Sequence, residues 1–387
     1  MSATKPVKFG IVGYGNSSRV YHLPYILPNK DIEVYAFLQR ASAPVDIESA
    51  KAGTHCRVDY PQSKHYQHED DFFADPEIEV VLVLTREDYH AYFAERALRA
   101  GKHGKSTSMI FYVVVEKPFT RTSAEADHLI ALAKETGKIL TVFQNRRLDA
   151  DFQTVSKIIN SGALGDITEY EKRYDVDSPP WAVHAGQGEW EPGKGLLYGL
   201  GSHTIDQALQ LFGRPKSVIG ILRNTVDAES ENDTVFMIIL QYGEEKRNLI
   251  VTIRTTVVSV MKDQLQGFVR GTKGTFIKYG DCLQEVQHFA GLPATDPSFG
   301  VDPPSRYGYL TTNAKVDECQ AYDEDSKKYI GRYPSLRGRY LSYYENVVDA
   351  VRGKAEIAVK PEESRDGIRI MELARESHRK GVTVPWS

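Results

Sequence analysis

The chain has 387 residues, a formal net charge of −4, and 41% hydrophobic and 26% charged residues. This length exceeds that of one average domain, and the composition is typical of a folded globular protein with a large core. The small acidic excess provides no basic surface for nucleic acid or an anionic membrane. We therefore expect two or three domains and a small-molecule partner.

The cysteines and the N-terminus indicate the cellular compartment. Cys56, Cys282 and Cys319 are an odd number at wide spacing, without a C-x-x-C pair or a visible His/Cys ligand cluster. We expect reduced thiols and no metal site. The opening segment lacks a long apolar stretch with a cleavage site, and no run of about 18 apolar residues occurs. These features favour a cytoplasmic protein.

The first 145 residues alternate β-rich runs with helical patterns. Helical spacing is clear over 89–100 and over 123–136, where Ser123 is the expected N-cap and Gly137 the terminating glycine. Such alternation predicts an α/β domain, 1–145, with a doubly wound parallel sheet of the Rossmann type. The expected strands are 8–12, 32–38, 80–84, 113–115 and 139–143.

The pattern changes in the second domain, 146–387. A helix over 151–161 precedes longer alternating strands, which predict a large open, mostly antiparallel sheet with one covered face. Residues 280–335 show no period and are expected to be mostly loop. Helices over 340–352 and 362–379 are expected to return to the first domain. The expected strands are 168–174, 217–223, 234–242, 249–258 and 264–270.

A glycine turn follows the first strand. In GYGNSS, Gly13 would make the tight turn and Gly15 would let the backbone approach a pyrophosphate at a helix N-terminus. Asn16, Ser17 and Ser18 complete the motif, with Ser18 as a small residue in place of a third glycine. The position after a strand predicts dinucleotide binding, and a purely structural turn is the alternative.

The end of the second strand bears on the choice of cofactor. An acidic residue there would take the ribose hydroxyls of NAD, but this chain has Gln39, Arg40 and Ser42. A cation and a hydroxyl suit a 2′-phosphate, so we predict NADP, with NAD still possible. The alternative is a solvated arginine at a strand end.

Four segments in this order carry a family resemblance: GYGNSS, TREDYH, VVVEKPF and LLYGLGSHTIDQALQLFG. The chain resembles the Gfo/Idh/MocA family of NAD(P)-dependent oxidoreductases from residue 8 to about 386, and EKP after a valine run is its most specific signal. The resemblance implies a Rossmann domain and an open-sheet α/β substrate domain. It also implies hydride transfer to or from a sugar, polyol or related hydroxyl or carbonyl carbon, and commonly a homodimer or tetramer formed through the sheet.

The resemblance assigns roles around the cofactor. Lys117 ends a core strand at its ligand edge, where it would hydrogen-bond the reacting oxygen and stabilise developing alkoxide charge. A Glu–Lys surface pair is the alternative. Glu116 would lie near the cofactor ribose. Thr85 and His90 would line the nicotinamide half, although His90 is equally consistent with packing at a helix start.

Further residues are assigned to the second half of the site. Asn145 and Arg146, after the last Rossmann strand, are expected to contact cofactor and substrate respectively, and Trp181 lies in a loop that would cap the pocket. His203 is expected near the reacting oxygen, with a helix-cap or core histidine as the alternative.

One position departs from the family pattern. Relatives usually carry an aspartate four residues before the histidine, and this chain has Gly199. His203 would then act alone, or Tyr198 or Asp206 would substitute as proton carrier. The hypothesis of an oxidoreductase that uses Lys117 and His203 therefore has two alternatives. One is a non-catalytic dinucleotide-binding sensor or regulator on the same scaffold, and the other is an enzyme that uses Tyr198.

A second departure precedes the strand of Lys117. The segment GKSTSMIFY, 104–112, interrupts the family's usual run from AGKH into VVVEKP. We expect an exposed loop that feeds the same strand, because loops tolerate insertions. A mis-spliced gene model is the alternative.

Overall fold

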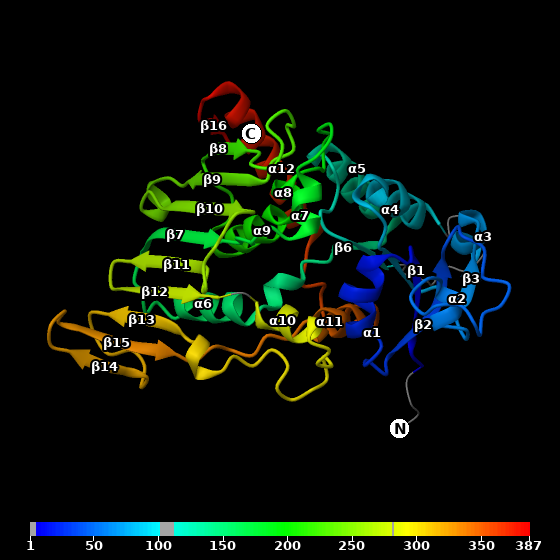
Figure 1. Cartoon of the computed structure of the whole chain (residues 1–387), viewed down its shortest axis with the longest axis horizontal. Coiled ribbons are helices and arrows are strands. Elements are labelled where there is room, and N and C mark those ends of the chain that lie inside the picture. Colours follow the sequence, from blue (N-terminus) through cyan, green and yellow to red (C-terminus); the bar gives the residue numbers. More distant parts are fainter. Residues whose placement is uncertain (1–4, 101–111, 281) are drawn as a thin grey trace. The chain divides into compact units, whose positions relative to one another are not determined.

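The computed structural model describes residues 5–100, 112–280 and 282–387 (Figure 1). The chain divides into two compact units. Unit 1 comprises 1–144 with 340–365, and unit 2 comprises 145–339 with 366–387. Most of the predicted insertion, 104–111, lies outside the described residues, and Tyr112 opens a strand. Within the described ranges, no helix combines the length and the apolar character needed to cross a membrane.

Unit 1 is built on a six-stranded parallel sheet in the order β3-β2-β1-β4-β5-β6. Every residue of β4 and β5 is buried, as expected for a parallel sheet covered on both faces. The predicted doubly wound Rossmann sheet is therefore confirmed. Its strands are β1 (Val7–Val12), β2 (Ile32–Leu38), β3 (Lys64–Tyr66), β4 (Val80–Val83), β5 (Tyr112–Val115) and β6 (Ile139–Val142).

Helices flank this sheet. Helices α4 and α5 contact each other and strands β4 to β6, whereas α11 contacts α1. The N-cap of α5 is Thr122 and not the predicted Ser123, because Thr122 and Glu125 form a reciprocal capping box. The helices are α1 (Leu23–Ile26), α2 (Cys56–Asp59), α3 (Glu69–Ala74), α4 (His90–Arg99), α5 (Ser123–Thr136) and α11 (Leu341–Val351), with a π-helix at Ser17–His22 and a 3₁₀ turn at Glu87–Tyr89.

Unit 2 contains a ten-stranded sheet in the order β14-β15-β13-β12-β11-β7-β10-β9-β8-β16. Strands β7 and β10 pair in parallel, and the other neighbours pair antiparallel, which confirms the predicted open, mostly antiparallel sheet. The strands are β7 (Ile167–Arg173), β8 (Ser217–Arg223), β9 (Val235–Gln241), β10 (Ile250–Thr256), β11 (Leu265–Gly271), β12 (Gly274–Tyr279), β13 (Gly308–Thr312), β14 (Gln320–Asp323), β15 (Lys328–Tyr333) and β16 (Val384–Pro385).

One face of this sheet carries the core of unit 2. Buried residues alternate along β8 and β9, and residues such as Ile238 and Ile253 pack with Phe152, Ile205 and Ile370 of the covering helices. The helices are α6 (Ala150–Asn160), α7 (Pro180–Ala185), α8 (Leu196–Gly199), α9 (Gly201–Phe212), α10 (Leu283–Phe289) and α12 (Pro361–Lys380), of which residues 366–380 belong to unit 2.

The prediction that 280–335 is mostly loop holds for more than half of the segment, but it misses one helix and three strands. This segment holds α10, β13, β14 and β15. The strands have four to six residues, and β15 has no fully buried position, so they lack the hydrophobic alternation that reveals a strand. Polar contacts join these strands, since the side-chain amide of Gln320 in β14 donates to the hydroxyl of Thr312 in β13 and to the carbonyl of Tyr329 in β15.

Candidate active site

The glycine turn has the backbone geometry that dinucleotide binding requires. Gly13 has φ of +99°, and an added Cβ would lie 2.8 Å from the carbonyl oxygen of Leu84. At Gly15 an added Cβ would meet nothing within 4 Å. Gly13 is therefore needed for the turn itself, whereas Gly15 leaves an open backbone surface. That surface fits the close approach of a pyrophosphate.

The serines of the turn make different contacts. Ser18 is buried and donates its hydroxyl proton to the carbonyl oxygen of Gly13 at 2.7 Å, so this side chain stabilises the turn. Ser17 donates to Oε1 of Glu116 at 2.8 Å and thereby joins the turn to the end of β5. Asn16 is exposed beside them and is accessible to a ligand.

Glu116 is a buried carboxylate with several partners in unit 1. Nε2 of His22 lies 3.1 Å from Oε1 of Glu116, and Nδ1 of His22 contacts the hydroxyl of Tyr344. Burial opposes ionisation, but the contacts with His22, Lys117 and Ser17 outweigh it and lower the pKa of Glu116 to about 2. Glu116 therefore supplies a fixed negative charge beneath the turn.

Lys117 follows Glu116 at the carboxyl edge of β5 and is half-buried. The peptide bond between Lys117 and Pro118 is cis. Nδ1 of His90 lies 2.7 Å from the carbonyl oxygen of Pro118, and its Nε2 lies 3.1 Å from that of Thr85. Both ring nitrogens thus face backbone, so His90 ties the ends of β4 and β5 together in the position expected of a packing residue.

The residues after β2 differ in exposure. The side-chain oxygen of Gln39 accepts from the backbone N–H of Cys56 at 2.9 Å, so Gln39 is engaged in the loop. Arg40 is exposed, with its guanidinium carbon 6.0 Å from the ring centroid of Tyr89. The hydroxyl of Ser42 accepts from Gln67 at 2.9 Å. Arg40 therefore presents a cation at the sheet edge where a ribose phosphate would lie.

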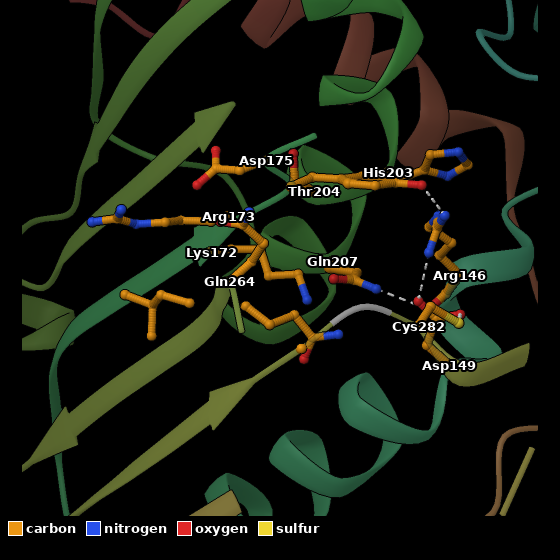
Figure 2. A pocket seen from close by; sticks show the side chains of 14 residues that line it. Arg146, Asp149, Lys172, Arg173, Asp175, His203, Thr204, Gln207, Gln264 and Cys282 are labelled. Atoms are coloured by element: carbon orange, nitrogen blue, oxygen red, sulfur yellow. Dashed lines mark hydrogen bonds and ion pairs between the residues drawn. The ribbon is translucent and has the colours of Figure 1, made fainter. Parts of the chain in front are cut away.

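Unit 2 contains a polar pocket between β7, β11 and α9 (Figure 2). Figure 2 shows His203, Thr204 and Gln207 on the α9 side and Lys172 and Arg173 on β7. Hydrogen-bonding side chains predominate in the lining, which suits a ligand rich in hydroxyl groups. The principal lining residues are Arg146, Asp149, Lys172, Asp175, His203 and Gln207.

Two cations of this pocket, Arg146 and Lys172, are buried. Arg146 lies 3.2 Å from Asp149 and 2.6 Å from Glu285, and stacks on the ring of Tyr174 with 4.4 Å to the centroid. Burial lowers the pKa of Lys172, although the negative charges of Asp151 and Asp149 act in the opposite direction.

Four other predicted site residues lie outside the lining of this pocket: the substrate candidates Asp206 and Trp181, the catalytic candidate Tyr198 and the cofactor candidate Asn145. Asp206 forms a buried two-point ion pair with Arg147, at 2.7 and 2.5 Å, and this fixed pairing leaves it poorly suited to carry a proton. Tyr198 is buried in α8 on the side of Arg375, and Trp181 is 53% exposed in α7. Asn145 is buried in the 3₁₀ turn Asn145–Leu148.

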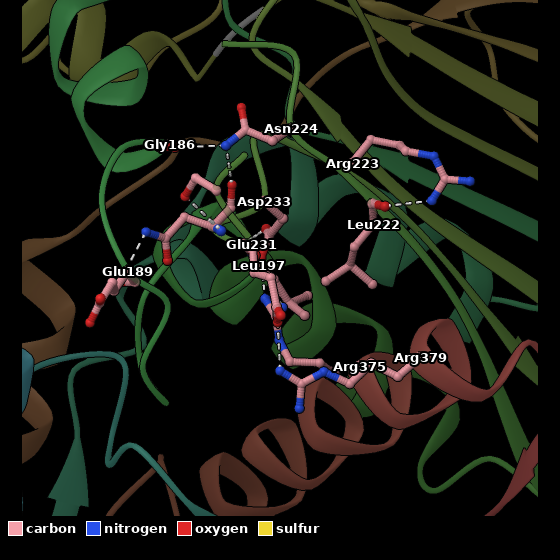
Figure 3. A network of polar contacts seen from close by, with 12 residues as sticks. Gly186, Glu189, Leu197, Leu222, Arg223, Asn224, Glu231, Asp233, Arg375 and Arg379 are labelled. Carbon is pink, nitrogen blue, oxygen red and sulfur yellow. Dashed lines mark hydrogen bonds and ion pairs between the residues drawn. The ribbon is translucent and has the colours of Figure 1, made fainter. Parts of the chain in front are cut away.

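A buried network anchors the segment before α9 (Figure 3). The carboxylate of Asp233 accepts from the backbone N–H of Leu197 at 2.6 Å and from the guanidinium of Arg375 in α12. Burial raises the pKa of Asp233 to about 6 against the opposing charge of Arg375. Trp190 stacks on Arg375, with 4.4 Å from its ring centroid to the guanidinium carbon. The network holds α8, which leads directly into the helix of His203.

The charged lining residues that sequence reasoning missed include Lys172, Asp149 and Asp175. Lys172 lies in a strand with several charged residues, a pattern that is typical of a solvent-exposed strand. Its burial depends on the packing of β7 between β11 and β10, which are distant in the sequence. Asp149 precedes a helix and resembles an ordinary N-cap. No local signal distinguishes these residues from surface charges.

Comparisons with known proteins agree with this geometry. A model described as "Oxidoreductase family, NAD-binding Rossmann fold" matches residues 7–144, and one described as "GFO/IDH/MocA C-terminal domain" matches residues 152–277. The chain belongs to the Gfo/Idh/MocA family of oxidoreductases. The predicted family and enzyme class are thereby confirmed.

Similar proteins cover nearly the whole chain. The chain is 34% identical to the scyllo-inositol 2-dehydrogenase (NADP(+)) IolW of Bacillus subtilis, over 98% of this chain and 95% of that protein. It is also 34% identical to an uncharacterized oxidoreductase of Schizosaccharomyces pombe, over 98% and 99%. The solved structure of the oxidoreductase yvaA from Bacillus subtilis superposes with a TM-score of 0.83 at 31% identity and covers all of both chains.

Proposed function

We propose that this Gfo/Idh/MocA oxidoreductase uses NADP(H) to transfer a hydride to or from a hydroxyl or carbonyl carbon of a sugar, polyol or related compound. The observation that carries the proposal is the placement of Lys117, which leaves β5 beside a glycine turn that Glu116 binds directly through Ser17. A lysine at that edge is suited to polarise an oxygen that undergoes hydride chemistry.

Different residues of unit 1 would bind different parts of the cofactor. Gly13, Gly15 and the turn's N–H groups would hold the pyrophosphate, and Arg40 with Ser42 would take the 2′-phosphate. When bound, the nicotinamide supplies or accepts the hydride. Lys117 then donates a hydrogen bond to the reacting oxygen and stabilises its negative charge. The family resemblance assigns His203, in the pocket of unit 2, to proton exchange with the substrate.

The pocket of unit 2 supports a polyhydroxylated substrate. Its lining combines cations, carboxylates and amides, which together satisfy hydroxyl groups as both donors and acceptors. Similar proteins are named scyllo-inositol 2-dehydrogenase and, at 26% identity over 55% of this chain, D-glucoside 3-dehydrogenase of Escherichia coli. Both names describe oxidation of a carbon that bears a hydroxyl group.

We also propose that the enzyme is a cytoplasmic homodimer that pairs through the uncovered face of the unit 2 sheet. Large apolar side chains are exposed on several strands of this sheet, among them Ile221 at 42%, Ile250 at 47% and Tyr309 at 38%. Light scattering after size exclusion would give twice the chain mass. A monomer at micromolar concentration would contradict this assembly.

A panel assay tests the activity. NADPH oxidation and NADP⁺ reduction are measured with sugars, polyols, aldehydes and diketones, for the wild type and for Gly199→Asp. An added Cβ at Gly199 meets only Leu196, at 3.9 Å, so the aspartate should fit. Turnover by the wild type is the expected result. Activity in Gly199→Asp alone would instead favour a dinucleotide-binding sensor whose catalytic set is incomplete.

A further inference from the structure

Three side chains with metal-ligating atoms converge in the loop region after β2. One nitrogen from each of His55 and His65 and the sulfur of Cys56 lie within 4.8 Å of one another. His55 and Cys56 are buried, and His65 is half-buried. The sequence showed no such cluster, because His65 follows nine residues after Cys56 and reaches it only when β3 pairs with β2.

Hydrogen bonds to backbone carbonyls fix the tautomers of both imidazoles. Nε2 of His55 lies 3.1 Å from the carbonyl oxygen of Ala41, and Nε2 of His65 lies 2.8 Å from that of Gln39. A carbonyl oxygen only accepts, so each Nε2 carries the proton and each Nδ1 keeps a lone pair. Histidines that bind metal ions typically donate their other ring N–H to a backbone carbonyl in this way.

The ligand atoms lie a few tenths of an ångström to about 1 Å farther apart than in a tetrahedral zinc site, so they would have to close slightly around the ion. Nδ1 of His55 lies 4.0 Å from Sγ of Cys56. With Zn–S of about 2.3 Å and Zn–N of about 2.0–2.1 Å, a tetrahedral site places nitrogen and sulfur about 3.6 Å apart. Nδ1 of His55 now accepts from the N–H of Arg57 at 3.1 Å, and this bond would be exchanged for the ion. Two nitrogens and one thiolate suit zinc among the common divalent ions.

We propose that His55, Cys56 and His65 bind a Zn²⁺ ion, with a water in the fourth position. The thiol proton is released to solvent on binding, and no redox change occurs. The ion would fasten α2 to the end of β2, since Gln39 and Ala41 provide the carbonyls behind the two ligands. Metal binding at these residues does not depend on the proposed activity.

Cobalt is the probe of choice, because thiolate ligation gives a near-ultraviolet charge-transfer band. The full-length protein is stripped with a chelator, kept reduced, and titrated with Co²⁺. One equivalent should produce the band, and Zn²⁺ should displace the cobalt. Cys56→Ser should remove the band, and His65→Ala should weaken Co²⁺ binding at least about tenfold.

Two control variants match these substitutions. Cys319→Ser removes a partly exposed thiol, and His68→Ala removes an exposed histidine three residues from His65; both should bind cobalt like the wild type. Far-ultraviolet circular dichroism and thermal melting report that each variant is folded. If Cys56→Ser does not fold, the proposal is tested by the charge-transfer band of the wild type and by the cobalt affinity of His65→Ala.

The site is overturned by a wild type without the thiolate band, or by a folded Cys56→Ser that keeps it. Cobalt binding that His65→Ala leaves unchanged would also contradict it. Because the readout is metal binding, failure of the proposed enzymatic activity would leave this result unaffected.

Discussion

Ser17 donates a hydrogen bond to Glu116 at 2.8 Å, which joins two residues 99 positions apart in the chain. Ser17 opens the helix after the glycine turn, and Glu116 precedes Lys117 at the end of β5. The segment that would hold the cofactor phosphates and the segment that would act on the substrate oxygen are thus directly connected. The buried carboxylate of Glu116 is the hydrogen-bond acceptor that links the two segments.

Glu116→Gln should destabilise the protein in a pH-dependent way. The folded-state pKa of about 2 lies below the ordinary 4.5, so the ionised carboxylate stabilises the fold above pH 4.5, and this contribution is lost as the pH falls toward 2. We expect the free energy of unfolding of Glu116→Gln to be about 3 kcal/mol lower than that of the wild type at pH 7. Urea unfolding at pH 7 and pH 2.5 measures it, with exposed Glu33→Gln as control. An equal difference at both pH values would contradict the assignment.

Gly13→Ala and Gly15→Ala should separate folding from binding. Alanine at position 13 meets the Leu84 carbonyl at a φ that L-residues avoid, so unfolding should become easier by about 1–3 kcal/mol. Alanine at position 15 has space in the protein and should leave the melting temperature unchanged, while NADPH affinity falls at least about tenfold. Fluorescence titration and thermal melting test both. Intact NADPH binding by a folded Gly15→Ala would refute the placement of the pyrophosphate.

Arg40→Ala should reduce the preference for NADP. An exposed guanidinium paired with a 2′-phosphate is worth about 1–3 kcal/mol, so NADPH affinity should fall about 10- to 100-fold, with little change for NADH. Equilibrium titrations of both cofactors give the ratio. Equal affinities for NADPH and NADH in the wild type would remove the basis of the NADP assignment.

Lys172→Met should impair use of the substrate. This substitution keeps most of the side-chain volume but removes the buried ammonium from the pocket, so KM should rise about tenfold while cofactor affinity stays unchanged. Lys157→Met, on an exposed face of α6, is the matched control. An unchanged KM would indicate that the substrate binds away from β7.

The sequence predicted those features that local rules determine. Gly13 and the strand before Lys117 were identifiable because turn chemistry and β-branched runs are local signals. The strands over 308–333 were missed because short, half-exposed strands depend on pairing for their stability. The pairing of Asp206 with Arg147 and the convergence of His55 with His65 depend on tertiary contacts between distant residues, and sequence spacing carries no information about them.

The most direct test of the proposed function is turnover and NADPH affinity of Lys117→Ala, measured beside the exposed control Lys157→Ala. If Lys117 acts on the reacting oxygen, turnover should fall by about 10² to 10⁴ while NADPH binding persists. Wild-type turnover in Lys117→Ala, on a substrate that the wild type reduces, would show that the lysine after β5 has no role in the chemistry and would contradict the account.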